Sequence, residues 1–125
     1  MVRYIKSDKY GDIPLRLTIS GVKRFEFKTG KKIFSGQSNI NELTLDDMEK
    51  LFLVSWQKGC RADEIPFPQK VQDDPEELED IFDDVYADFF KILPQLFQDM
   101  SGKVVPEELE AQKAKQVAPI PDEKN

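Results

Sequence analysis

The feature that most constrains the fold is a long amphipathic segment over residues 75–100. Its apolar residues recur at intervals of three and four, which places them on one face of an α-helix. They are Leu78, Ile81, Phe82, Val85, Phe89, Ile92, Leu96 and Met100. Asp74, Pro75 and the acidic residues that follow favour a helix start, and Ser101-Gly102 favours its end. Pro94 predicts a kink, or a split near Leu93. A helix with one apolar face must pack against the rest of the chain.

The apolar sector of this helix is unusually wide. At 100° per residue, Tyr86, Phe90 and Phe97 fall to one side of the stripe above, and Leu93 lies between the two sets. Together they cover roughly half the circumference, more than the ~100° that one core contact requires. We therefore predict that Tyr86, Phe90, Leu93 and Phe97 form a partner-binding surface for self-association or for a client. The alternative is that a hairpin or the C-terminal tail covers them.

The other predicted elements are a hairpin and a shorter helix. Residues 15–19 and 24–29 alternate apolar with polar side chains around Ser20-Gly21, which is typical of a β-hairpin. Thr44 is a suitable N-cap for a helix over residues 45–58, and Gly59 is a plausible stop. Residues 59–74 contain two prolines and no helical period, so they are predicted to be a connection.

These elements predict one α+β domain over residues 13–102, with an N-terminal antiparallel β-hairpin packed on two main helices. Residues 1–12 are interpreted as an irregular arm, and residues 103–125 as a charged, Pro-containing, disordered tail. A chain of 125 residues fits a single domain. The predicted core comprises Leu17, Ile19, Phe25, Phe27, Leu45, Met48, Phe52, Trp56, Leu78, Phe82, Val85, Phe89 and Leu96.

The sequence lacks the usual parts of an enzyme. It contains no histidine and a single cysteine, Cys60, so catalytic triads and cysteine or histidine zinc sites are not expected. No Gly-rich phosphate loop is present, and the acidic run from Asp73 to Asp88 lacks the loop glycine of a calcium site. We interpret Cys60 as a bystander thiol and the acidic run as the solvated side of the helix. No catalytic residue, cofactor or metal is predicted.

Charge and cysteine content limit the partners and the compartment. The net charge is −6, which disfavours nucleic acid and anionic membranes. Residues 1–32 carry nine basic and three acidic residues, hence +6, whereas the remainder carries −12. Two such parts can attract each other within one fold or between copies, although ordinary solvated charge is the alternative. A lone cysteine, no apolar leader and no membrane-spanning run predict a cytoplasmic protein.

The order of these parts supports a family resemblance over about residues 13–102. The runs Leu15-Arg16-Leu17-Thr18-Ile19 and Phe25-Glu26-Phe27 come first. They are followed by Leu43-Thr44-Leu45-Asp46-Asp47, Trp56-Gln57-Lys58-Gly59 and the acid-capped Asp74-Pro75-Glu76-Glu77-Leu78. In this order, and in size and charge, the chain resembles the tail assembly chaperones of long-tailed (siphovirus-type) bacteriophages. The resemblance implies a non-enzymatic protein of the host cytoplasm that self-associates. It also implies binding to the tape measure protein, with the tail tube protein as a further partner, before the tail tube polymerises.

Two other functions stay open at this point. The acidic helix face is compatible with a small inhibitor that mimics nucleic acid, and the size is compatible with a structural adaptor subunit of a phage particle. A mimic would bind mainly through charge and would be displaced by salt, whereas a chaperone bound through apolar contacts would resist salt.

Overall fold

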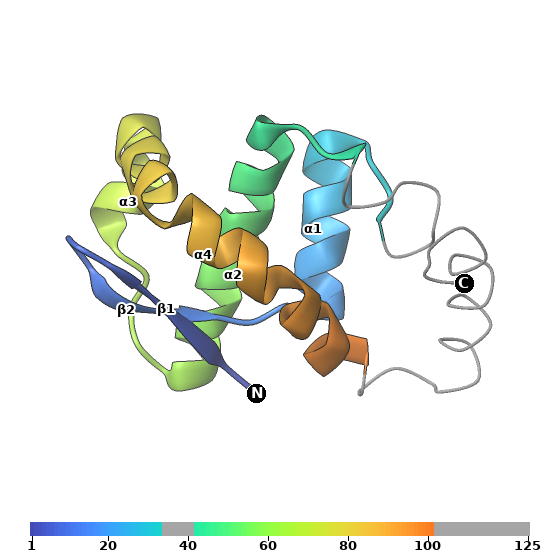
Figure 1. Cartoon of the computed structure of the whole chain (residues 1–125), viewed down its shortest axis with the longest axis horizontal. Helices are drawn as coiled ribbons and strands as arrows, with labels where there is room; N and C mark the ends of the chain where they lie inside the picture. Colours follow the sequence, from blue (N-terminus) through green and yellow to red (C-terminus); the bar gives the residue numbers. More distant parts are fainter. Residues whose placement is uncertain (34–41, 102–125) are drawn as a thin grey trace.

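The computed structural model describes residues 1–33 and 42–101. Within them are two strands, β1 (Arg3–Ser7) and β2 (Gly11–Leu15), and four helices, α1 (Ile19–Thr29), α2 (Leu45–Asp63), α3 (Gln69–Asp73) and α4 (Pro75–Ser101). Strand β2 and helix α1 both pack against α2, and β1 packs against α4 (Figure 1). The predicted class, an α+β fold with an N-terminal antiparallel hairpin on two main helices, is confirmed.

The hairpin lies earlier in the chain than predicted. Strands β1 and β2 pair antiparallel, with Ile5 opposite Ile13, so residues 1–12 are not an irregular arm. The turn between the strands ends at Gly11, the first residue of β2, whose φ of 68° is a left-handed conformation that glycine adopts at little cost. In the same turn the backbone N–H of Tyr10 donates to the Ser7 hydroxyl over 2.7 Å. The alternation Ile5–Ser7 and the run Ile13–Leu15 were the strand signals, and the mixed charge around them concealed these signals.

The second run of the predicted hairpin is helical instead. Thr18 caps α1 by accepting from the N–H of Gly21 over 2.9 Å, and Gly30 ends the helix at φ 75°. In a strand, residues two apart share a face, but in a helix they point about 200° apart. Phe25 is therefore fully buried while Phe27 is 90% exposed. The predictions of Ile19, Phe27 and Leu45 as core residues are wrong, since all three are exposed; the other ten predicted core residues are buried.

Helix α2 begins as predicted but runs past Gly59. Thr44 and Asp47 form a reciprocal capping box at its start. The helix continues to Asp63, and Glu64 ends it at φ 58°. Gly59 is needed because β2 crosses the helix there: a Cβ on Gly59 would lie 2.2 Å from the carbonyl oxygen of Pro14. The predicted helix end at residue 58 is therefore wrong.

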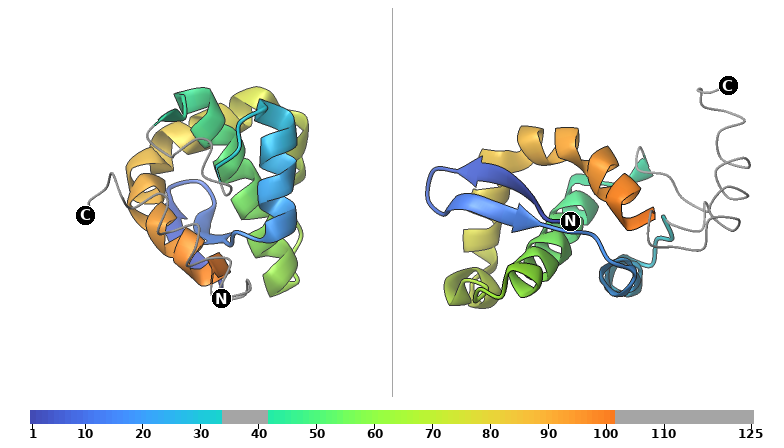
Figure 2. Two further views of the ribbon diagram at one scale, coloured as in Figure 1. Left: turned by 90° about the vertical axis from the view of Figure 1, so that its right-hand side faces the viewer. Right: turned by 90° about the horizontal axis from the view of Figure 1, so that it is seen from below.

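The structure of residues 59–74 and the path of α4 both differ in part from the predictions. Residues 59–74 are not a plain connection, because they contain the last turn of α2 and the short helix α3. Helix α4 continues through Pro94 without splitting. It follows a curved path over the hairpin and α2 (Figure 2). The predicted tail, residues 103–125, lies outside the described residues.

An aromatic cluster joins α2 to α4 in the core. The ring of Phe52 lies 5.5 Å from Trp56, 5.7 Å from Phe82 and 5.3 Å from Phe89 between centroids. Trp56 is 2% exposed, so the predicted phase of α2 is confirmed. Aromatic contacts of this kind bury large apolar areas with defined geometry. They therefore hold the two helices in a fixed relative position, and any surface that combines side chains of α2 and α4 depends on this position.

Candidate functional site

The four predicted partner-binding residues do not form one surface. Tyr86 is partly buried and stacks on Phe90, with ring centroids 5.9 Å apart at 30°. Phe90 is 45% exposed, whereas Leu93 is only 1% exposed and belongs to the core. Phe97 is partly buried and packs against that core. Leu93 therefore lies in the core and not on a surface that a partner can reach in this structure, and Tyr86 with Phe90 is the part that solvent reaches.

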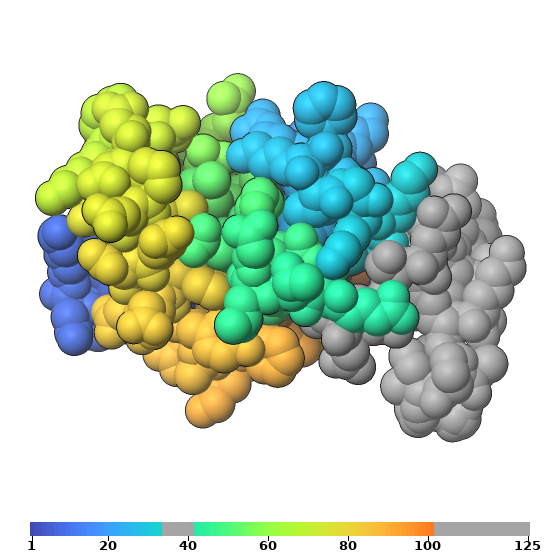
Figure 3. All heavy atoms as spheres, turned by 90° about the horizontal axis from the view of Figure 1, so that it is seen from above, coloured from blue at the N-terminus to red at the C-terminus, as the bar shows by residue number. Residues whose placement is uncertain are grey.

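A pocket adjoins Tyr86, between the start of α2 and the first half of α4. Its volume is about 290 Å³. Its apolar walls are Leu45, Phe82 and Tyr86, and its acidic rim consists of Asp46, Glu49, Glu79 and Asp83. We call these seven residues the acid-rimmed pocket. Leu45, 65% exposed, forms one wall, and the Tyr86 ring meets Phe82 edge-on at 5.4 Å. Figure 3 shows the start of α2 next to α4 on the face it presents.

Sequence reasoning missed most of this pocket. Glu79 and Asp83 were interpreted only as part of a solvated acidic face, and Leu45 as core. The helical wheel of α4 places Glu79 and Asp83 on the same flank as Tyr86 and Phe90, which was a usable signal. A wheel of one helix does not show which other helix lies beside it, and the other half of the rim comes from the first turns of α2.

The carboxylates of the rim repel one another. Partial burial raises the pKa of Glu49, and the negative charges of Glu79 and Asp46 raise it further, against a smaller opposing effect of Lys50. The Lys50 ammonium pairs with Asp46 one turn away in the same helix. The pocket thus offers apolar walls with an excess of negative charge around them. A partner that brings an apolar side chain flanked by cations would relieve this repulsion.

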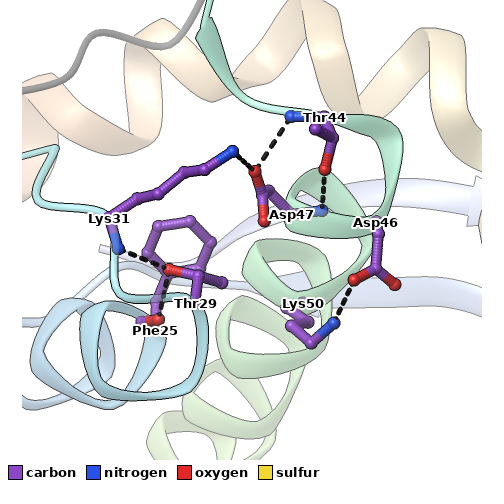
Figure 4. A network of polar contacts seen from close by, with 7 residues as sticks. All are labelled: Phe25, Thr29, Lys31, Thr44, Asp46, Asp47 and Lys50. Atoms are coloured by element: carbon purple, nitrogen blue, oxygen red, sulfur yellow. Dashed lines mark hydrogen bonds and ion pairs between the residues drawn. The ribbon is translucent and has the colours of Figure 1, made fainter.

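Polar contacts fix the start of α2 and so the position of Leu45 and Glu49 (Figure 4). Asp47 accepts from the Thr44 N–H over 2.9 Å and from Lys31 Nζ over 2.5 Å. Burial raises the pKa of Asp47, but the hydrogen bonds from Lys31 and Thr44 outweigh burial and hold it below its usual value. The Lys31 N–H also donates to the Thr29 hydroxyl over 3.1 Å. The end of α1 is thereby linked to the helix turn that carries the pocket.

A second polar network ties the hairpin to α4. Glu77, 5% exposed, accepts from the Tyr10 hydroxyl and pairs with Lys9 Nζ, both at 2.7 Å. The hydrogen bond to Glu77 is the largest of the effects that raise the pKa of Tyr10 to about 12. The contacts from Lys9 and Tyr10 hold the pKa of Glu77 below its usual value. The network has a structural role, because its carboxylate is enclosed by the side chains that it joins.

The structure also places the single cysteine and the possible metal-ligating side chains. Cys60 is buried, and burial raises the pKa of its thiol, so it is held as the unreactive neutral form. Across residues 1–33 and 42–101, no three His, Cys, Asp or Glu side chains gather as a potential metal site. In that same part of the chain, no helix is long and apolar enough to cross a membrane.

Comparison with known proteins adds no relative: no protein-family model, curated protein or solved structure matches this chain. The fold and the pocket together define a small hairpin-and-helix protein with an exposed aromatic surface beside an acidic rim.

Proposed function

We propose that this chain is a non-enzymatic tail assembly chaperone of a long-tailed bacteriophage, acting in the host cytoplasm. In this proposal it binds the tape measure protein before the tail tube polymerises, associates with itself, and meets the tail tube protein as a further partner. The observation that carries the proposal is the exposed apolar surface of Leu45, Tyr86 and Phe90 beside the acid-rimmed pocket.

The shape of this surface favours a protein segment as the ligand. At about 290 Å³ the pocket is slightly smaller than typical small-molecule sites, which occupy roughly 300–1,000 Å³. It lies on two helices held by the core, so little ordering is required on binding. Exposed aromatic residues next to a pocket are the usual anchors of protein interfaces. An amphipathic helix with apolar residues on one face and basic residues along its border would fit both the walls and the rim.

Co-expression tests the proposal directly. The chain would be produced with the tape measure protein encoded in the same phage genome, and soluble, co-purifying tape measure protein would be quantified. We expect Phe90→Ser and Leu45→Asp to reduce the recovered complex several-fold, because both residues are exposed and contribute little to monomer folding. Asp88→Asn, an exposed change on α4 outside the pocket, is the matched control and should retain the complex. Equal recovery with all variants would contradict this docking surface.

Salt dependence separates the chaperone from an acidic inhibitor that mimics nucleic acid. A complex held by apolar contacts should survive 0.5 M salt, at which exposed charge pairs are largely screened beyond roughly 4–5 Å. A complex that dissociates there, and that tolerates Phe90→Ser, would favour the mimic. A structural adaptor would instead be found in finished particles, which a chaperone leaves before completion.

A further inference from the structure

The outer face of α1 carries a second unusual surface. Phe27 is 90% exposed, the highest value for any large apolar side chain in residues 1–33 and 42–101. Lys23 and Arg24 are exposed one helical turn before it, and Lys28 is exposed at the next position along the helix. The opposite side of α1, with Val22 and Phe25, is buried against the core. We call Lys23, Arg24, Phe27 and Lys28 the basic aromatic face.

Positive charges crowd along this side of the molecule. Partial burial of its exposed side chain lowers the pKa of Lys28, and the neighbouring cations Arg24 and Lys50 lower it further. Burial likewise lowers the pKa of Lys58 on α2, with additional effects from Arg24 and Arg61. These cations repel one another, as the carboxylates of the acid-rimmed pocket do. An anionic surface brought against α1 would relieve the repulsion.

The two surfaces match in both chemistry and number of charges. We propose that Phe27 of one copy inserts into the acid-rimmed pocket of a second copy, where Lys23, Arg24 and Lys28 face the carboxylates of the rim. The aromatic ring would meet apolar walls, and three cations would meet four carboxylates, of which Asp46 already pairs with Lys50. This inference rests on the proposed function in one respect, since both assign the pocket to protein docking.

The contact must join two molecules. With 90% of its surface exposed, Phe27 does not occupy the pocket of its own chain. Helix α1 packs against α2, buries Val22 and Phe25 in the core and is joined to α2 by the Lys31–Asp47 ion pair, so it cannot swing round to that pocket. A nucleic acid on the basic face would have to approach a molecule of net charge −6. A second copy supplies the required anionic, apolar surface without that cost.

The first test is the concentration dependence of self-association, measured by sedimentation velocity on the full chain. The wild type should associate, and Phe27→Ser should raise the dissociation constant by roughly tenfold or more, as for a buried interface anchor. Chemical denaturation of Phe27→Ser should match the wild type, because the side chain is already in solvent. A wild type that stays monomeric to millimolar concentration, or a Phe27→Ser variant that associates equally well, would overturn the proposal.

The second test exchanges the charges. One variant carries Lys23→Glu, Arg24→Glu and Lys28→Glu, and the other carries Glu49→Lys, Glu79→Lys and Asp83→Lys. Each alone should be monomeric because like charges then meet, whereas a mixture of the two should associate, since opposite charges are restored between the variants. Asp88→Lys, a reversal on α4 outside the pocket, should associate like the wild type. The contact would be overturned if the two monomeric variants stay monomeric when they are mixed. It would also be overturned if the only binding observed is to nucleic acid or to the chain's own residues 103–125.

The two proposals fail separately. Phe27→Ser leaves the pocket intact, so it should still recover the tape measure protein in co-expression. If self-association follows the charge exchange but no client is recovered, the chaperone proposal fails and this contact stands. If client is recovered while Phe27→Ser and the charge exchange have no effect on association, the chaperone proposal stands and this contact fails.

Discussion

The replacement Gly59→Ala tests how closely the backbone of β2 crosses α2. An added Cβ would lie 2.2 Å from the Pro14 carbonyl oxygen, 2.4 Å from the Pro14 carbonyl carbon and 2.7 Å from the Leu15 nitrogen. Non-bonded heavy atoms normally pack at about 3.5 Å or more. All three atoms belong to the backbone, so no side-chain rotation can relieve the clash. The strand would have to move from the helix by on the order of 1 Å.

Three effects set the magnitude. Replacing glycine by alanine within a helix ordinarily stabilises by about 1 kcal/mol. Overpacking costs typically about 1–3 kcal/mol, occasionally more. A shift of β2 also threatens the hydrogen bond from the Arg16 N–H to the Ser55 carbonyl, 3.1 Å long, worth about 1 kcal/mol. The net expectation is a loss of roughly 1–3 kcal/mol in the free energy of unfolding.

Urea denaturation followed by the fluorescence of Trp56 provides the assay, since this single tryptophan is buried beside Gly59 in α2. Ala62→Gly, at an exposed position of the same helix, is the control for helix propensity and should cost about 1 kcal/mol or less. If Gly59→Ala is as stable as the wild type, or gains the ordinary 1 kcal/mol of an alanine, the close crossing is refuted.

Three further predictions concern burial and charge. Leu93→Ala should cost about 2–5 kcal/mol as a cavity in the core, whereas Phe90→Ala should cost about 1 kcal/mol or less because nearly half the ring is in solvent; equal losses in urea denaturation would contradict the assigned burial. Glu77 has a lowered pKa in the folded state, so its stabilising contribution is present above its ordinary pKa of 4.5 and lost as the pH falls through the lower native value. Glu77→Gln should therefore lower the melting temperature at pH 7. The difference in melting temperature between the variant and the wild type should become smaller in acid, and a difference that does not change with pH would contradict this linkage. Cys60 should react with a thiol reagent at pH 7 only at the rate of unfolding, and rapid labelling of the native chain would show that its burial is wrong.

Local signals in the sequence determined the long helices. The capping pair Thr44 and Asp47 and the Asp74-Pro75 start both lie within one turn of the helix that they begin, so the beginnings of α2 and α4 were predictable to the residue. The repeat of apolar residues at three and four likewise placed Trp56 and Phe89 in the core. These features depend on contacts between residues close in sequence, which is why a single sequence contains them.

Tertiary contacts decided what those signals could not. The run containing Phe25 and Phe27 alternates like a strand, yet packing on α2 requires only one of the two rings, and caps at Thr18 and Gly30 select the helix. Gly59 reads as a helix stop, but the passage of β2 gives it another role. The acid-rimmed pocket depends on α2 lying beside α4, and its rim combines side chains from both helices, up to 37 residues apart in the sequence. Such an arrangement is set by the packing of the whole core, because only the folded chain determines which helix flanks become neighbours.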